Sequence, residues 1–273
     1  MLSKFRSLLA LPLLLAAIAH VPEARAQARE EARLLVATEV LDELRDQRDQ
    51  VIPERLLQRA YGVAIIPDVT KVAFVVGGRH GNGVMVVRDS KGRFTSPVFV
   101  NLTGGSVGWQ IGAQSTDIVL VFTSRRGIEG IADGKLTLGA GASVAAGPVG
   151  RAGEAAAGMN AEVFSYSRNR GLFAGVALDG TALTMDNKAN ANFYAKRGVL
   201  ASDIMAGSVT KNSENVRRLL RAIASSTGET ATLQTTGETP APAPNAPAQP
   251  APANNGGVRT FPMEDPTPGG EPR

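Results

Sequence analysis

The sequence predicts an α+β protein with a single β-rich domain, in which an antiparallel sheet of barrel-like or sandwich-like form is flanked by N- and C-terminal helices. Three observations support this prediction. The chain contains 30 glycines in 273 residues, about 11% against a usual ~7%. Short alternating or β-branched runs, separated by glycine-rich segments, fill its middle and are typical of strands joined by tight turns. Amphipathic segments of helical period precede and follow these runs.

The N-terminal segment 1–26 has the pattern of a secretory signal peptide. Lys4 and Arg6 form a basic start, Leu8–Ile18 is apolar, and Ala24–Ala26 is a small-residue cleavage site. An uncleaved membrane anchor is the alternative, but an apolar run of 11 residues is too short to span a bilayer. We therefore expect a periplasmic or secreted protein that is cleaved near its last signal-peptide alanine.

The first helix expected in the mature chain is Gln27–Gln50, which has one apolar side. The apolar positions are Leu34, Leu35, Val40, Leu41 and Leu44. Two interpretations stay open: the helix packs on the domain, or it lies on a lipid surface with these residues as membrane contacts. A second helix is predicted over Glu54–Ala60, because Pro53 suits a first helical turn, where its missing N–H would be unpaired anyway.

A series of short runs in the middle of the chain is predicted as strands. They are Tyr61–Ile66, Lys71–Val76, Val84–Arg88, Phe94–Asn101, Ser106–Ala113, Asp117–Phe122 and Leu136–Ala146. Pro67 and Asp68 predict the end of the first strand, and the glycines of Gly77–Gly83 and Thr103–Gly105 predict turns. Arg125–Ala132 is predicted as a short helix between two strands.

A hairpin is predicted after these strands. Phe164–Ser167 alternates large and small side chains, which is the period of a strand with one buried face. Arg168–Gly171 supplies a turn, since Asn and Gly tolerate positive φ, and Leu172–Leu178 forms the returning strand.

The C-terminal part is predicted to change from helix to disorder. Short helical pieces are expected over Ala189–Arg197 and Ala201–Ala206, and Ser213 is placed to cap a final helix, Glu214–Ala224. The segment 226–273 is rich in Thr, Ala, Pro and Asn and cannot bury enough apolar surface to order itself. We expect it to be a disordered spacer or tether.

Composition excludes several kinds of site. The chain has no cysteine, so it has no disulfide, no thiolate metal site and no lipid-modified cysteine. His80 is the one histidine outside the predicted signal peptide, and Asp117, Asp133 and Asp179 lack the spacing of a metal loop, so no metal or cofactor is expected. Without residues 1–26 the chain keeps 26 basic and 24 acidic residues, and a net charge of about +2 does not predict nucleic-acid binding.

Two motifs that resemble enzyme sequences have the wrong context. Gly104–Gly108 matches the G-x-S-x-G nucleophile elbow, which requires a strand, a sharp turn and a helix, followed by an acid and a histidine. Here Trp109–Gly112 alternates like a strand, and His80 precedes the serine. Gly77–Gly83 lacks the Lys-Ser/Thr of a phosphate loop and is followed by a strand. No catalytic residue, and no enzymatic activity, is therefore expected.

Arginines in predicted turns are the candidate contacts to anions, because guanidinium binds phosphate in a bidentate manner. They are Arg125, Arg126, Arg151, Arg168 and Arg170. The alternative is that they are ordinary solvated turn charges. Trp109, the one tryptophan, is either a core residue or an aromatic at an interface.

Several ordered blocks of the chain carry a resemblance to a known family. They are Ala60–Pro67, Val75–Gly78, Gly81–Gly83, Gly105–Gly112, Asp117–Val119, Ala146–Arg151, the Phe164–Gly175 hairpin, Asn192 and Tyr194. As a set, they make the segment from about Ala60 to Tyr194 similar to the SYLF domain, a lipid-binding and actin-regulator family. This defines an expected SYLF-like domain over residues 27–225, with its core over 60–195.

The resemblance implies a β-rich domain with flanking helices and no enzymatic activity. It also implies binding to membrane lipids, in part through an N-terminal amphipathic helix, which would here be Gln27–Gln50. We therefore expect a non-enzymatic protein of the bacterial envelope that binds anionic lipid headgroups peripherally. The alternative is a protein–protein interaction module of the envelope with no direct lipid role. Actin is not an expected partner in that compartment.

Overall fold

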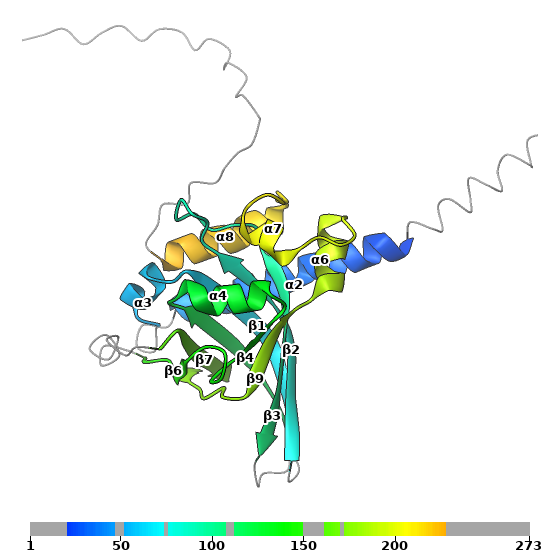
Figure 1. The fold of residues 1–273 in the computed structure, drawn as a ribbon. Helices are drawn as coiled ribbons and strands as arrows, with labels where there is room; N and C mark the ends of the chain where they lie inside the picture. Colours follow the sequence, from blue (N-terminus) through cyan, green and yellow to red (C-terminus); the bar gives the residue numbers. More distant parts are fainter. Residues whose placement is uncertain are drawn as a thin grey trace, which may run out of the picture. The chain divides into compact units, whose positions relative to one another are not determined.

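The structure is a computed structural model of the chain. The described residues are 21–46, 52–73, 76–107, 112–149, 161–169 and 172–227. All lie in the first of two units, residues 1–233, and consist of a curled nine-stranded sheet with helices against both faces (Figure 1). The predicted α+β class is thereby confirmed. Most of the predicted signal peptide and nearly all of the predicted tail lie outside the described residues, so both stay predictions.

The sheet is built around the strands that come first in the chain. The strands are β1 (Gly62–Ala73), β2 (Val76–Val87), β3 (Val98–Val107), β4 (Gly112–Phe122), β5 (Lys135–Thr137), β6 (Val144–Ala146), β7 (Val163–Asn169), β8 (Leu172–Gly175) and β9 (Thr181–Met185). Their order is β5-β9-β3-β2-β1-β4-β7-β6, and β8 pairs with β7. All pairs are antiparallel except β6 with β7, which is parallel.

Helices cover both faces of this sheet. They are α2 (Val21–Asp46), α3 (Glu54–Gln58), α4 (Arg125–Ala132), α6 (Asn187–Tyr194), α7 (Ala201–Met205) and α8 (Glu214–Ser226). None of the helices in the described ranges is both long and apolar enough to cross a membrane. The predicted cap of α8 is present, because the Ser213 hydroxyl accepts a hydrogen bond from the N–H of Val216. Pro53 stands one position before the first turn of α3, as its N-cap residue.

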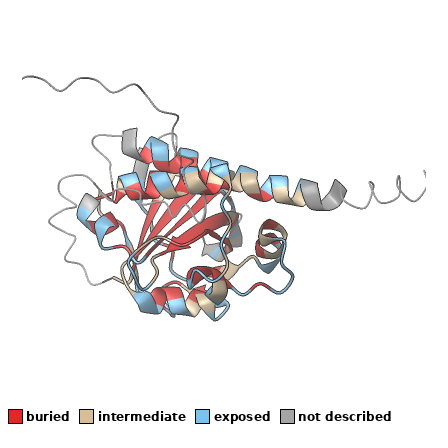
Figure 2. Cartoon of the chain, turned by 90° about the horizontal axis from the view of Figure 1, so that it is seen from above, coloured by how far each residue is buried: buried red, intermediate tan, exposed pale blue. Residues whose placement is uncertain are grey.

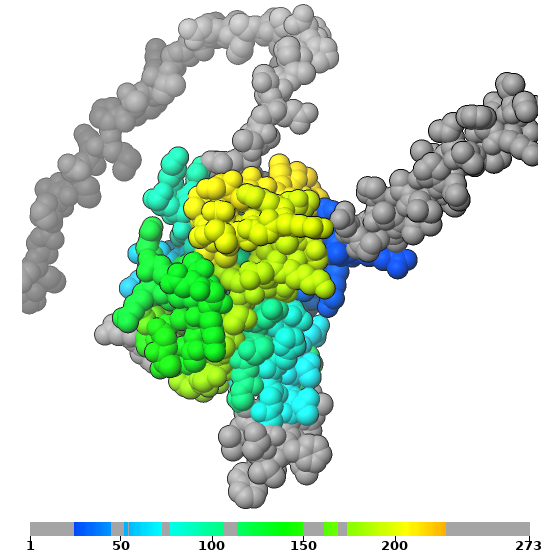
Figure 3. Space-filling model, turned by 45° about the vertical axis from the view of Figure 1, so that its right-hand side comes forward, coloured from blue at the N-terminus to red at the C-terminus, as the bar shows by residue number. Residues whose placement is uncertain are grey.

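Each face of the sheet has its own hydrophobic core. Because alternate side chains of a strand point to opposite faces, Val63 and Ile65 of β1 join the core under α2, α3, α6 and α8. Ala64 and Ile66 join the other core, under α4 and α7. Figure 2 shows the buried strands between these helical layers. The far ends of β2 and β3 extend past the helices (Figures 1 and 3).

The first two predicted strands are one, so the predicted end at Pro67 and Asp68 is wrong. β1 runs through both residues, with a register irregularity against each neighbouring strand. Asp68 takes a φ of 51°, and its N–H donates to the Asp117 carboxylate at 2.9 Å. The irregularity is a β-bulge that accommodates Pro67, which has no N–H to donate to a neighbouring strand.

The predicted turn at Gly77–Gly83 is also wrong, because these residues lie inside β2. The glycines serve close packing against the bulge instead. A Cβ at Gly83 would lie 2.4 Å from the carbonyl oxygen of Ile65, and one at Gly81 would lie 2.7 Å from a Val69 methyl group. Such contacts are far below van der Waals distance, so neither position has room for a side chain.

Three further sequence predictions need correction. Thr103–Gly105 is not a turn but part of β3, where a Cβ at Gly104 would lie 2.8 Å from the Thr181 hydroxyl of β9. The strand predicted over Leu136–Ala146 is divided into β5 and β6. β9 itself was not predicted. The hairpin is confirmed, since β7 and β8 pair antiparallel. Its bounds differ, because Arg168 lies in β7 opposite Phe173 rather than in the turn, and β8 ends at Gly175.

Candidate functional site: arginine surfaces of the domain

Arg168 is enclosed by carboxylates. Its Nε lies 2.6 Å from Oδ2 of Asp117 on the adjacent strand, and its Nη1 forms an ion pair with Glu43 of α2. Burial raises the pKa of the Asp117 carboxyl and lowers that of the Arg168 guanidinium. The predicted headgroup contact at Arg168 would therefore compete with two internal ion pairs.

These residues line a pocket of about 300 Å³ between α2 and the sheet. Its lining includes four acidic side chains, Glu39, Glu43, Asp68 and Asp117, together with Arg168. An excess of negative charge disfavours the approach of a phosphate. This side of the hairpin is thus a poor place for an anion.

Arg125 and Arg126 are the first two residues of α4, and both are exposed. The guanidinium of Arg125 lies 5.7 Å from the centre of the Tyr61 ring, which is a cation–π distance. The helix start is fixed by Ser124, whose hydroxyl accepts from the N–H of Gly127 at 3.3 Å. Arg151, Arg170 and Trp109 lie outside the described residues, so the predictions for them stay predictions.

The apolar side of α2 packs on the domain, which is the first of its two interpretations. Leu34, Val40, Leu41 and Leu44 are each at most 2% exposed and belong to the core. Leu35, at 37%, is the exposed one of the five predicted membrane contacts. Lipid contact by the other four would require the helix to leave the sheet.

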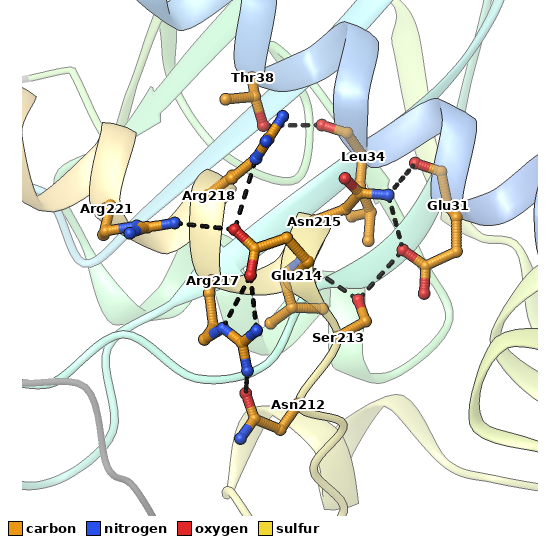
Figure 4. Close-up of polar contacts among 11 residues, drawn as sticks. Glu31, Leu34, Thr38, Asn212, Ser213, Glu214, Asn215, Arg217, Arg218 and Arg221 are labelled. Carbon is orange, nitrogen blue, oxygen red and sulfur yellow. Dashed lines mark hydrogen bonds and ion pairs between the residues drawn. The ribbon is translucent and has the colours of Figure 1, made fainter.

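Among the described residues, three partly exposed arginines gather on α8, outside the turns in which anion contacts are predicted. Arg217, Arg218 and Arg221 all contact the carboxylate of Glu214 (Figure 4). The shortest nitrogen-to-oxygen distances are 2.5 Å, 3.5 Å and 3.1 Å, respectively. We call these four residues the α8 arginine cluster.

Helix geometry explains the α8 arginine cluster. Positions three, four and seven residues after Glu214 share its side of the helix, so three guanidinium groups meet one carboxylate. These hydrogen bonds, that of Arg217 first, lower the pKa of Glu214. The group therefore carries two uncompensated positive charges among its own members at neutral pH. This spacing was readable from the sequence.

The α8 arginine cluster is held on a fixed support. The opposite side of α8 buries Val216, Leu219 and Ile223 in the core. At its start, Glu31 of α2 accepts a hydrogen bond of 3.0 Å from Ser213 (Figure 4). The arginine side chains themselves remain between 41% and 55% exposed. Such an arrangement presents positive charge to a flat or extended anionic partner without rearrangement of the backbone.

The hydrolase-like motif lies in the wrong structural context. His80 is exposed on β2, and Gly104 lies inside β3 rather than on a turn into a helix. Among the residues that the structure describes, no group of three His, Cys, Asp or Glu side chains could hold a metal ion. The G-x-S-x-G motif therefore begins within a strand and not at the turn from a strand into a helix that a nucleophile elbow requires.

Comparison with known proteins gives a consistent set of relatives. Residues 103–226 match the family described as Ysc84, "Las17-binding protein actin regulator". The chain is similar to Protein YSC84 of Saccharomyces cerevisiae, with 41% identity over 151 residues, 54% of this chain and 32% of the relative. It is similar to the SH3 domain-containing YSC84-like protein 1 of Xenopus laevis (32% identity over 193 residues) and of Homo sapiens (34% over 194 residues).

The matches to these two vertebrate proteins cover 70% of this chain, and 57% and 56% of the relatives, respectively. The chain thus spans about a third of the yeast relative and little more than half of the vertebrate ones.

Proposed function

The chain belongs to the Ysc84 family, the SYLF family that its sequence resembles, and on this premise we propose that it is a non-enzymatic protein that binds anionic phospholipid headgroups. Binding is peripheral and electrostatic. The α8 arginine cluster carries the proposal, because it combines exposed arginines with a rigid support. The proposal includes a periplasmic or secreted location, as the N-terminal segment predicts.

The physical argument rests on charge and geometry. Guanidinium groups bind phosphate oxygens in a bidentate manner, and each basic residue near an anionic bilayer contributes about 1 kcal/mol. The two excess charges of the α8 arginine cluster therefore supply about 2 kcal/mol, or roughly a thirtyfold gain in affinity. Arg125 and Arg126 add further exposed positive charge on α4.

The test is flotation of the protein with vesicles of phosphatidylcholine alone or mixed with phosphatidylglycerol, at low and high salt. The variant R217Q/R218Q/R221Q removes the cluster's positive charge from exposed positions. The matched control K91Q/K135Q/K188Q removes the same net charge from three exposed lysines elsewhere in the domain. We expect binding only to anionic vesicles, weakened by salt and by the arginine variant, and largely retained by the lysine control.

An equal loss in both variants would show that only the net charge matters, and an absence of flotation would refute the proposal. Five of the six substituted positions are exposed and Arg217 is half-buried, so both variants are expected to fold. Circular dichroism of each variant checks this expectation.

A protein partner is the second candidate function, favoured by the description of the matched family as Las17-binding. In this proposal an envelope protein docks on exposed apolar side chains such as Leu200, which is 60% exposed, and the Pro-rich segment after residue 226 acts as a tether. Apolar docking resists salt, whereas headgroup binding weakens with ionic strength. Crosslinking in the envelope at both ionic strengths separates the two proposals.

A further inference from the structure

A second basic feature lies away from α8, where β1 begins. A pocket of about 390 Å³ is lined by Gln58, Arg59, Ala60, Tyr61, Arg88 and Thr123. We call it the Tyr61 pocket. Its described lining contains two arginines and no carboxylate. Its volume falls in the lower part of the ~300–1,000 Å³ range of small-molecule sites.

The walls of the Tyr61 pocket are fixed by backbone and side-chain hydrogen bonds. The N–H of Tyr61 donates to the carbonyl of Phe122, and its own carbonyl accepts from the N–H of Arg88, both at 2.8 Å. The Arg88 side chain donates from Nε to Ala60 and from Nη1 to Gly92, each at 2.7 Å. The pocket is therefore preorganised, which lowers the ordering cost of binding.

The groups in the Tyr61 pocket suit an anion that carries a ring. Arg59 follows α3 and is exposed, and Arg125 adds positive charge beside the Tyr61 ring. That ring is 38% exposed and offers an apolar wall. The Thr123 hydroxyl donates to the carbonyl of Ala161 at 2.7 Å, so its oxygen remains able to accept from a ligand hydroxyl.

We propose that the Tyr61 pocket binds a small phosphate monoester of a sugar, with the phosphate toward Arg59 and the sugar ring against Tyr61. The volume of the pocket exceeds that of a phosphate ion alone, and the aromatic wall provides contact for the carbon skeleton. The same phosphate monoester chemistry occurs in soluble sugar phosphates and in the lipid phosphatidic acid. This site is separate from the α8 arginine cluster and does not depend on the proposed function.

The test is calorimetric titration of the purified full-length protein with glucose 6-phosphate, glycerol 3-phosphate, inorganic phosphate and glucose. A parallel flotation arm uses phosphatidylcholine vesicles with and without phosphatidic acid. R59Q removes the proposed phosphate contact. R55Q is the matched control, because Arg55 is an exposed arginine of α3, just before Arg59, that does not line the pocket.

We expect glucose 6-phosphate to bind more tightly than glycerol 3-phosphate, and glucose not to bind. R59Q should weaken binding about tenfold or more, since a charge-assisted hydrogen bond is lost, and R55Q should not. Y61L should reduce the preference for the sugar ester over glycerol 3-phosphate. R217Q/R218Q/R221Q should leave these titrations unchanged, which separates this site from the headgroup proposal.

Binding of phosphatidic acid vesicles alone, lost in R59Q and kept in R55Q, would place a phosphate monoester at Arg59 but overturn the sugar ester as its source. Absence of binding in both arms would overturn the proposal. An equal loss in R59Q and R55Q would do the same, as would equal binding of glucose and its phosphate.

Discussion

Gly83 provides a sharp test of why β2 contains glycines. In the substitution G83A, the added methyl group would lie 2.4 Å from the carbonyl oxygen of Ile65 and 2.8 Å from the Cα of Ile66. Both atoms belong to the backbone of the neighbouring strand β1, next to its bulge. Relief therefore requires the strands to separate by roughly half an ångström or more, since carbon–oxygen contacts below about 3 Å are strongly repulsive.

The expected loss of stability follows from this geometry. Overpacking in a core costs about 1–3 kcal/mol, and a backbone clash at the centre of the sheet belongs at the upper end. A smaller opposing term of about 0.4–1 kcal/mol comes from the reduced freedom of the unfolded chain. We therefore expect a net loss of about 2 kcal/mol. For a domain of this size, that lowers Tm by roughly 4–8 °C.

The assay is thermal and urea unfolding followed by circular dichroism. The control is G105A in β3, where an added Cβ meets no atom within 4 Å. Its stability should be unchanged or slightly raised. A Tm for G83A within one or two degrees of the unsubstituted protein, or an equal drop for G105A, would refute the packing explanation.

Three further predictions concern α2 and α8. E214Q should increase flotation with anionic vesicles several-fold, because it removes the carboxylate that pairs with three arginines. Unchanged flotation would show that the α8 arginine cluster does not contact the vesicles. L44A should cost about 2–5 kcal/mol in urea unfolding, and L35A less than 1, because Leu44 is 1% exposed and Leu35 is 37% exposed. Burial raises the pKa of Glu30, so the folded state binds a proton more readily and the free energy of unfolding rises as pH falls through that pKa. E30Q should remove this pH dependence, which unfolding curves at a series of pH values would measure.

The helices and the last hairpin could be predicted from the sequence because their signals are local, although α2 begins at Val21 rather than at the predicted Gln27. Ser213 caps α8 as expected, and alternation over Phe164–Ser167 identified β7. The central strands could not be delimited in this way. Taken by themselves, Pro67 and the glycines at 77–83 predict turns. In the fold, Gly81 and Gly83 of β2 pack against the bulge that contains Pro67 in the paired strand β1. Only the pairing reveals that the residues form a bulge and its packing partner.

The candidate site shows the same division between local and long-range information. The spacing of Glu214 and the three arginines on α8 was present in the sequence, and its significance depends only on helix geometry. The neutralisation of Arg168 depends on Glu43 and Asp117, which are 125 and 51 residues away in the chain. No property of its predicted turn indicates either partner.

The order of the strands also determines how this domain can be divided. The part that matches the family begins at residue 103, within β3, and so excludes β1, β2 and the N-terminal helices. Yet β2 and β1 lie between β3 and β4 at the centre of the sheet. A fragment cut at that boundary would leave β4 and the rest of β3 without the two strands that pair between them, so both would have unpaired edges. The segment covered by the family model is thus smaller than the unit that folds, whereas the matches to the vertebrate relatives are longer, at 193 and 194 residues. Truncations should keep the buried side of α2, which begins at Glu30.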